Sequence, residues 1–154
     1  MPRHKSHLHD WPSLNAWLNR IGCDQDMIKR HFFYSALVDY FPGIKNGSHR
    51  IPSKQEISNE KGRLKKTISE FQPEVVVPIG RLSIAYCLGD KISALSDFIG
   101  KSYFADPYGL LGHNLTIIPL PHPSGASTWH HQPSNQALLQ QALQTLKNCL
   151  LINC

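Results

Sequence analysis

The segment with the clearest capacity for chemistry is PLPHPSGASTWHH, which runs from Pro119 to His131. Within it His122 stands between two prolines, which restrict the backbone so that the imidazole ring can be aimed. The small and hydroxyl-bearing residues that follow allow a close approach to another backbone or to a groove, and Trp129 offers a flat apolar surface. The combination indicates a recognition loop; a proline-rich turn before the last helix is the alternative.

A second candidate segment, PIGRLS, runs from Pro78 to Ser83. Gly80 permits a tight turn at the end of a strand. The helix that follows presents unpaired N–H groups and the positive end of its dipole, which together favour a phosphate group, with Arg81 alongside. Junctions of this kind are common, so this segment alone has low specificity.

Each candidate segment lies at the end of an apolar run typical of a buried parallel strand. The first run is Glu74–Gly80, before Arg81, and the second is Leu115–Leu120, before His122. A third strand is expected at Phe32–Val38. Helices are expected at residues 12–21, 24–30, 53–71, 81–88 and 135–151, the third of them started by a capping box of Ser53 and Glu56. This alternation predicts an α/β fold with an open, mainly parallel sheet and helices on both faces. Ligands of such sheets bind beyond the carboxyl ends of the strands, where both candidate segments lie.

The length of 154 residues is typical of a single domain, so we expect one domain over residues 1–154. Its polar first segment, residues 1–10, is expected to be flexible. No apolar run approaches the ~20 residues that span a bilayer, and the first segment lacks the apolar stretch of a secretory signal. These features predict a cytoplasmic protein.

Charge and cysteine content narrow the class of partner and of chemistry. Sixteen Lys and Arg against eleven Asp and Glu give a net charge of +5, which suits a polyanionic partner but is a weak signal alone. The cysteines form no Cys-x-x-Cys pair and are expected to be free thiols. They are Cys23, Cys87, Cys149 and Cys154.

The stretch HPSGAS, which starts at His122, resembles the second signature motif of the uracil-DNA glycosylase superfamily, a His-Pro-Ser segment at the end of the last strand of the sheet. An ordered series of further stretches is similar to the bacterial subgroup related to the iron–sulfur-bearing glycosylases. The series comprises FYSALV from residue 33, FPG from 41, RIPS from 50, VPIGRL from 77 and LPHPSGASTWH from 120. The resemblance covers roughly residues 12–148.

This resemblance implies a DNA-repair enzyme that flips a base out of the stack and hydrolyses the N-glycosidic bond of uracil or a related base. His122 would donate a hydrogen bond to the pyrimidine O2 and stabilise the departing anionic base. Single- or double-stranded DNA containing uracil would be the partner. The implied DNA contacts are a wedge loop of Ser124, Gly125, Ala126, Ser127 and Trp129, and a phosphate seat of Gly80, Arg81 and Ser83.

The chain also departs from the family pattern. The family's first motif is a Gly-rich segment after the first strand that positions the attacking water, and Met1–Asp10 does not match it. Asp106–Gly109, with the sequence DPYG, superficially resembles one form of that motif but stands elsewhere in the strand order, so we interpret it as a turn. Ala36 replaces an Asn that reads uracil in the iron–sulfur relatives. Tyr40 and Glu60 occupy two cluster-cysteine positions, so no iron–sulfur cofactor is expected.

These departures predict a domain without the family's first strand, which lies between the second and third. Phe32–Val38 and Val75–Ile79 would then pair directly, stand apart around a gap, or accept a strand from elsewhere. Two functions follow: an active N-glycosylase, or a catalytically impaired remnant that acts as a DNA-binding module. A Ser/His hydrolase built on Ser124 or Ser127 is disfavoured because the chain has no Gly-x-Ser-x-Gly elbow.

Overall fold

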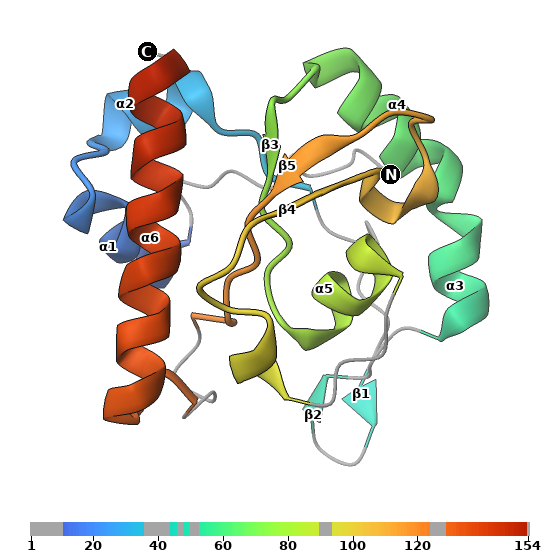
Figure 1. The fold of residues 1–154 in the computed structure, drawn as a ribbon. Helices are drawn as coiled ribbons and strands as arrows, with labels where there is room; N and C mark the ends of the chain where they lie inside the picture. Colours follow the sequence, from blue (N-terminus) through green and yellow to red (C-terminus); the bar gives the residue numbers. More distant parts are fainter. Residues whose placement is uncertain are drawn as a thin grey trace.

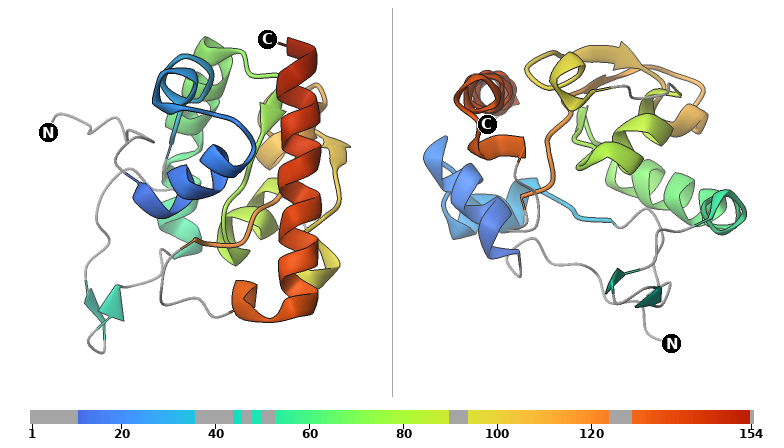
Figure 2. Two further views of the ribbon diagram at one scale, coloured as in Figure 1. Left: turned by 90° about the vertical axis from the view of Figure 1, so that its left-hand side faces the viewer. Right: turned by 90° about the horizontal axis from the view of Figure 1, so that it is seen from below.

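The computed structural model describes residues 11–35, 44–45, 48–49, 53–89, 94–123 and 129–153. Strands in the centre are flanked by two groups of helices, so the expected α/β class is confirmed (Figure 1). One group contains α1 (Pro12–Arg20), α2 (Gln25–His31) and α6 (Pro133–Asn153). The other contains α3 (Lys54–Asn59), α4 (Lys61–Phe71) and α5 (Arg81–Leu88). The view from below in Figure 2 separates the two groups most clearly.

The described strands of the central sheet lie in the order β3 (Val75–Val76), β5 (Leu115–Ile117) and β4 (Tyr103–Ala105). β3 and β5 run parallel with Val75 opposite Thr116, and a further bridge joins Ile79 to Leu120. Both apolar runs of the sequence therefore pair in the sheet as predicted. Pro78 interrupts the regular ladder because proline has no N–H to donate.

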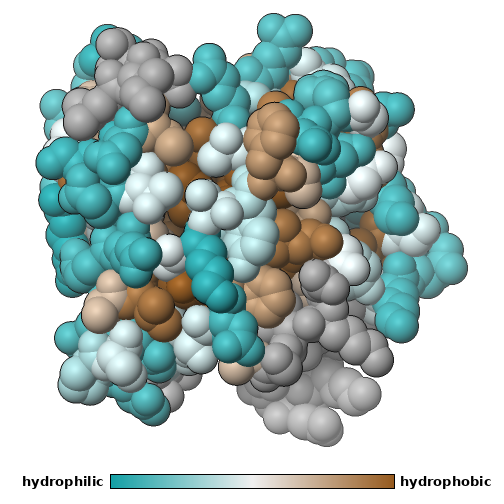
Figure 3. Space-filling view, viewed as in Figure 1, coloured by the Kyte–Doolittle hydropathy of each residue, from teal (hydrophilic) through white to brown (hydrophobic). Residues whose placement is uncertain are grey.

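The antiparallel pairing of β4 with β5 was not predicted. β4 has only three residues, inside a loop rich in Gly, Asp and Pro. Three residues are too few to show the alternation of apolar and polar side chains that predicts a strand. Its central residue, Phe104, leaves 71% of its surface exposed. On this face of the molecule hydrophobic surface gathers at the centre and hydrophilic surface covers the flanks (Figure 3).

A short hairpin of β1 (Ile44–Lys45) and β2 (Ser48–His49) is separate from the central sheet. Short 3₁₀ turns cover Leu95–Asp97, Pro107–Gly109 and Trp129–His131. No helix in the described ranges is long and apolar enough to cross a membrane.

The region expected to be one helix over residues 53–71 is in fact two helices, α3 and α4. Its predicted start is confirmed: the Glu56 N–H donates to Ser53 Oγ and the Ser53 N–H donates to Glu56 Oε1, each at 3.1 Å. The break comes at Glu60, whose ψ of −3° turns the chain. Gly62 follows in the second position of α4. Glycine is a poor helix former, so it does little to stabilise a continuous helix across this point.

The core forms where α6 and α1 pack over the sheet. The predicted apolar face of α6 is buried through Leu139, Ala142, Leu143 and Leu146. The same core contains Leu14, Leu18, Ile84, Ile118 and Leu120. Burial of each leucine or isoleucine among them contributes about 1.5–3 kcal/mol. The end of the strand that leads to His122 is thus fixed by packing against two helices.

The predicted strand Phe32–Val38 is not in a sheet in the part that the structure describes, Phe32–Ser35; residues 36–38 lie outside it. Phe32 has extended backbone angles, φ −116° and ψ 143°, but the segment stands apart from β3. Strand propensity favours the extended backbone without supplying a hydrogen-bonding neighbour. A side-chain bond holds the segment instead, because Arg63 Nη1 donates to Ser35 Oγ at 3.0 Å.

Arg63 is itself held by an ion pair with Glu60, with 2.7 Å between Nε and Oε2. The two side chains are only 8% and 14% exposed. A buried pair of this kind is costly to break because the remaining charge loses its partner. The pair therefore fixes α4 against the Phe32–Ser35 segment.

Replacing Arg63 by Met should lower the free energy of unfolding by about 3 kcal/mol, because Glu60 would keep a buried and uncompensated charge. Lys66→Met is the matched control, since Lys66 and Glu70 are 3.9 Å apart and 76% and 68% exposed. That change should cost less than about 1 kcal/mol. Urea unfolding followed by circular dichroism measures both, and equal losses would contradict a structural role for the buried pair.

Candidate functional site

The two candidate segments meet at one edge of the sheet, as the parallel arrangement predicts. The Gly80 N–H donates to the Leu120 carbonyl at 2.9 Å, and the Leu120 N–H donates to the Pro78 carbonyl at 3.0 Å. Gly80 adopts φ +86°, a backbone conformation that residues with an L side chain rarely adopt. A Cβ at this position would lie 3.7 Å from the Cβ and Cδ2 atoms of His122, so the tight turn brings the chain alongside the histidine.

His122 is presented from a rigid frame. Pro121 and Pro123 on either side are buried, whereas His122 itself is exposed. The indole ring of Trp11 covers one side of the imidazole, with 5.3 Å between the ring centroids. Partial burial lowers the pKa of His122 below its ordinary value because the charged form loses hydration. The imidazole is therefore neutral at pH 7 and keeps one N–H to donate.

Aromatic rings extend from His122 into the molecule. Trp11 meets Tyr34 edge-on at 6.3 Å between ring centroids. Burial, and then the nearby Cys23 thiol, raises the pKa of the Tyr34 phenol, which stays protonated. Neither ring is predictable as part of the site, because the sequence around Trp11 and Tyr34 carries no signal of the direction in which each ring points.

Behind the Gly80 turn, Ser83 Oγ lies 2.8 Å from the hydroxyl of Tyr108. Tyr108 has φ +57° and burial raises the pKa of its phenol. The Asp106 carboxylate holds this strained turn by accepting from the N–H groups of Leu111 and Gly112, both at 2.8 Å. The turn expected at Asp106–Gly109 is confirmed, but its tyrosine also reaches the candidate site.

Burial also raises the pKa of the Cys87 thiol to about 12, against smaller effects from hydrogen bonds to Tyr108. Cys23 and Cys149 are likewise free thiols. The raised pKa keeps the Cys87 thiol protonated at pH 7, so this group serves packing rather than nucleophilic chemistry.

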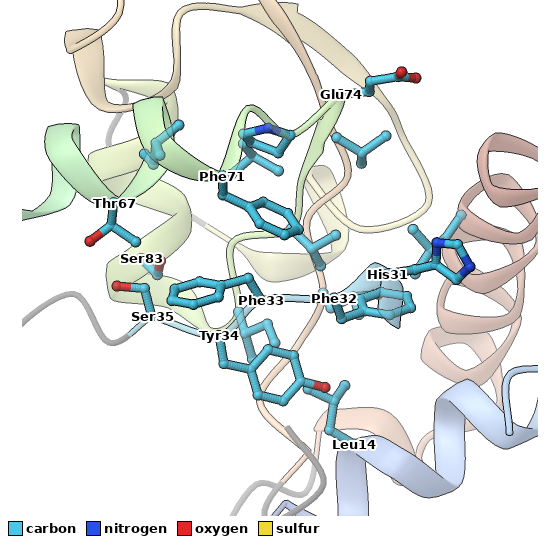
Figure 4. A pocket seen from close by; sticks show the side chains of 18 of the residues that line it. Leu14, His31, Phe32, Phe33, Tyr34, Ser35, Thr67, Phe71, Glu74 and Ser83 are labelled. Carbon is cyan, nitrogen blue, oxygen red and sulfur yellow. The ribbon is translucent and has the colours of Figure 1, made fainter. Parts of the chain in front are cut away.

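A cavity of about 1050 Å³ opens from this site and runs along β3. One wall is the extended segment Phe32–Ser35 and the other is β3 itself, with α4 above them (Figure 4). Near the candidate site the lining includes Trp11, Tyr34, Ser83, Tyr108 and His122. The cavity thus joins the end of the sheet to the interior of the molecule.

The remaining candidate residues are placed as follows. Arg81 is exposed in the first turn of α5, beside Gly80. Trp129 is half-buried against the core, and its carbonyl accepts a bond from Asn135 Nδ2 at 2.9 Å. Ser124, Gly125, Ala126 and Ser127 lie outside the described residues.

Two histidines follow the loop, and their rings are 4.3 Å apart at the centroids. His130 also packs edge-on against Trp17 at 5.5 Å. Burial, and then the charges of His131 and Arg20, lowers the pKa of His130. In the described ranges no group of three or more His, Cys, Asp or Glu residues is arranged to hold a metal ion.

Glu60, which the resemblance aligns with one of the two cluster cysteines, is the residue that pairs with Arg63. The other position, Tyr40, and the uracil-reading position, Ala36, lie outside the described residues. At Glu60 this chain therefore uses the position for a structural ion pair.

The family model of the uracil DNA glycosylase superfamily matches residues 6–147. The match includes His122, the Gly80 turn and the helices that position them. No curated protein matches the chain.

The pKa of His122 should rise toward about 6.5 in Trp11→Ala, because water would replace the indole beside the ring. A nuclear magnetic resonance titration of the imidazole Cε1 proton measures the change. Phe104→Ala removes an exposed aromatic on β4 and should leave the value unchanged. A wild-type value at or above about 6.5 would show that burial does not act on this ring.

Proposed function

Because the chain belongs to the uracil DNA glycosylase superfamily, we propose that it removes uracil or a related base from DNA by hydrolysing the N-glycosidic bond. Membership gives a glycosylase-like role in DNA repair and DNA as the substrate. The observation that carries the specific proposal is the position of His122, held between buried prolines at the opening of an aromatic-lined cavity. A base must leave the stack to react, and such a cavity gives it a place to go.

His122 acts in this proposal as a hydrogen-bond donor to the pyrimidine O2. The bond to the sugar breaks as negative charge accumulates on the base, and a fixed N–H stabilises that charge. The lowered pKa makes the neutral imidazole the donor at pH 7. Trp11 and Tyr34 provide ring surface for the face of the base.

The DNA backbone is assigned to the start of α5. The N–H groups of its first turn and the positive end of the helix dipole favour a phosphate. Arg81 is exposed beside them. The Ser83 hydroxyl bonds to Tyr108, and a hydroxyl can donate one bond while accepting another.

The loop of Ser124, Gly125, Ala126 and Ser127 is proposed to enter the DNA where the base has left, with Trp129 at its end. Its small residues suit an approach to the stacked bases. The net charge of +5 supports binding to either single- or double-stranded DNA.

One observation favours a second function, DNA binding without efficient excision. Among the described residues that line the cavity, Glu74 is the one carboxylate. It precedes β3, whereas Gly80, which lies beside His122, follows six residues later, a span of up to about 20 Å in an extended chain. A carboxylate at that distance cannot position a water for attack beside His122.

His122→Ala should reduce uracil release about 10²- to 10³-fold, because the leaving base loses its hydrogen-bond donor. Release is measured from single- and double-stranded oligonucleotides that contain uracil. His113→Ala, which alters an exposed histidine just before β5, should retain full activity.

The outcomes separate the two functions. Excision that depends on His122 supports the glycosylase. Binding that weakens steeply with salt, with no release by the unaltered chain, supports the binding module. Release that survives His122→Ala would exclude the assigned role of this histidine.

A further inference from the structure

Tyr108 stands in a turn with a strained backbone. The 3₁₀ turn Pro107–Gly109 lies between β4 and β5, and within it Tyr108 has φ +57° and ψ 10°. In the described ranges Gln72 is the other residue besides glycine with a positive φ, and it ends α4. The left-handed region is unfavourable for a residue such as tyrosine, whereas glycine adopts it freely. A tyrosine at this position therefore indicates a use for its side chain.

The Tyr108 side chain reaches helix α5 from this turn. Its hydroxyl lies 2.8 Å from Ser83 Oγ, and it also hydrogen-bonds to the Cys87 thiol. Ser83 and Cys87 are four residues apart, so their side chains are neighbours on one face of the helix. Burial raises the pKa of the Tyr108 phenol, so the phenol keeps its hydrogen at pH 7.

The hydroxyl pair of Ser83 and Tyr108 lies at the end of the cavity that contains His122. Both residues line the cavity, and Ser83 is labelled on its wall in Figure 4. Ser83 follows Gly80 by about one turn of helix, and a Cβ at Gly80 would lie 3.7 Å from the His122 side chain. The neighbouring Leu82 in this wall is apolar. The pair is therefore a polar group beside an apolar part of the wall.

The proposed contact of Ser83 with a DNA phosphate fixes the direction of the bond between the two hydroxyls. A phosphate oxygen accepts hydrogen bonds, so Ser83 would give its hydrogen to the phosphate. Ser83 Oγ would then accept the hydrogen of Tyr108, because the phenol stays protonated. A hydroxyl has one hydrogen and two lone pairs. The Tyr108 oxygen is therefore left as an acceptor.

We propose that Tyr108 is a specificity-determining residue that accepts a hydrogen bond from the N3–H group of uracil. The inference rests on the proposed function, in which the base enters this cavity and His122 donates to O2. Flipped bases are distinguished by hydrogen bonds to the edge that is paired in the duplex. Uracil carries a donor at N3, whereas cytosine has a lone pair there, which the Tyr108 oxygen repels. Thymine carries the same N3–H, so this contact selects against cytosine.

The test measures binding of the full chain to single-stranded oligonucleotides that carry one 2′-fluoro-2′-deoxyuridine or its N3-methyl derivative. Fluorine at C2′ slows cleavage of the glycosidic bond, because it disfavours positive charge at C1′. Fluorescence anisotropy gives the two dissociation constants. The unaltered chain should bind the uracil oligonucleotide at least about tenfold more tightly, since the methyl group replaces the donor and leaves the Tyr108 oxygen unpaired.

Tyr108→Phe separates base recognition from a structural role. The variant keeps the ring but removes the acceptor oxygen, and the space that the oxygen leaves admits the methyl group. The ratio of the two dissociation constants should therefore fall by about tenfold, whereas a structural loss would weaken both oligonucleotides alike. Tyr86→Phe is the matched control, because Tyr86 is on α5 but outside the described lining of the cavity. It should leave the ratio unchanged.

Ser83→Ala tests the direction of the hydrogen bond. Without Ser83 Oγ, the Tyr108 hydrogen can turn toward the cavity and be donated to the N3 lone pair of cytosine. The Cys87 sulfur is a weak acceptor and does not hold this hydrogen. All oligonucleotides should bind more weakly because the phosphate contact is lost. The preference for 2′-fluoro-2′-deoxyuridine over 2′-fluoro-2′-deoxycytidine should fall several-fold in addition.

Three outcomes overturn the proposal: equal binding of the uracil and N3-methyl oligonucleotides by the unaltered chain, equal weakening of both by Tyr108→Phe, or an unchanged preference over cytosine in Ser83→Ala. Circular dichroism establishes that each variant is folded, and the other two measurements decide the question if Tyr108→Phe is not. Uracil release from 2′-deoxyuridine is measured in the same preparations. Discrimination without release identifies a failure of the glycosylase, and release without discrimination identifies a failure of this proposal.

Discussion

The parallel pairing of Ile79 with Leu120 determines where everything else in the site can lie. This bridge places the Gly80 turn and the His122 segment side by side, with hydrogen bonds of 2.9 and 3.0 Å on either side of Leu120. Leu120 is 1% exposed, so hydrophobic packing and backbone bonding fix the same residue. A slip of one residue would invert every side chain of the strand and move His122 to the other face. The register is therefore a condition for the site as well as for the sheet.

Constraints on the other side of β3 are of a different kind. The Phe32–Ser35 segment has no strand partner in the described structure, and it is held by the link from Glu60 through Arg63 to Ser35. These side-chain bonds hold the Phe32–Ser35 segment in place without filling the cavity between this segment and β3. Backbone pairing would have brought the walls to about 4.8 Å and removed the cavity. The cavity persists because side chains, rather than backbone bonds to β3, hold the Phe32–Ser35 segment.

Sequence patterns predicted the parts of the fold that rest on local signals. The capping box of Ser53 and Glu56 and the apolar face of α6 follow from short-range spacing, and both are confirmed. The prediction of a strand at Phe32–Val38 was wrong in the described part, because a preference for extended backbone does not specify which strand it pairs with. In the site, the prolines around His122 predicted a rigid histidine, but the approach of Trp11 and Tyr108 depends on tertiary packing. Contacts between residues as far apart as Trp11 and His122, or Ser83 and Tyr108, leave no periodicity to detect.

His122 and the apolar walls formed by β3 and Phe32–Ser35 border one cavity. A base that enters this cavity, as proposed, would exclude water from the apolar walls between Val77 and Tyr34. With less water, the electrostatic effect of an N–H on a charged base becomes stronger, because the effective dielectric constant falls. The same change lowers further the pKa of a partly buried imidazole, which remains a neutral donor. A base bound in the cavity would thus strengthen the hydrogen bond that it accepts from His122, because its own entry excludes water.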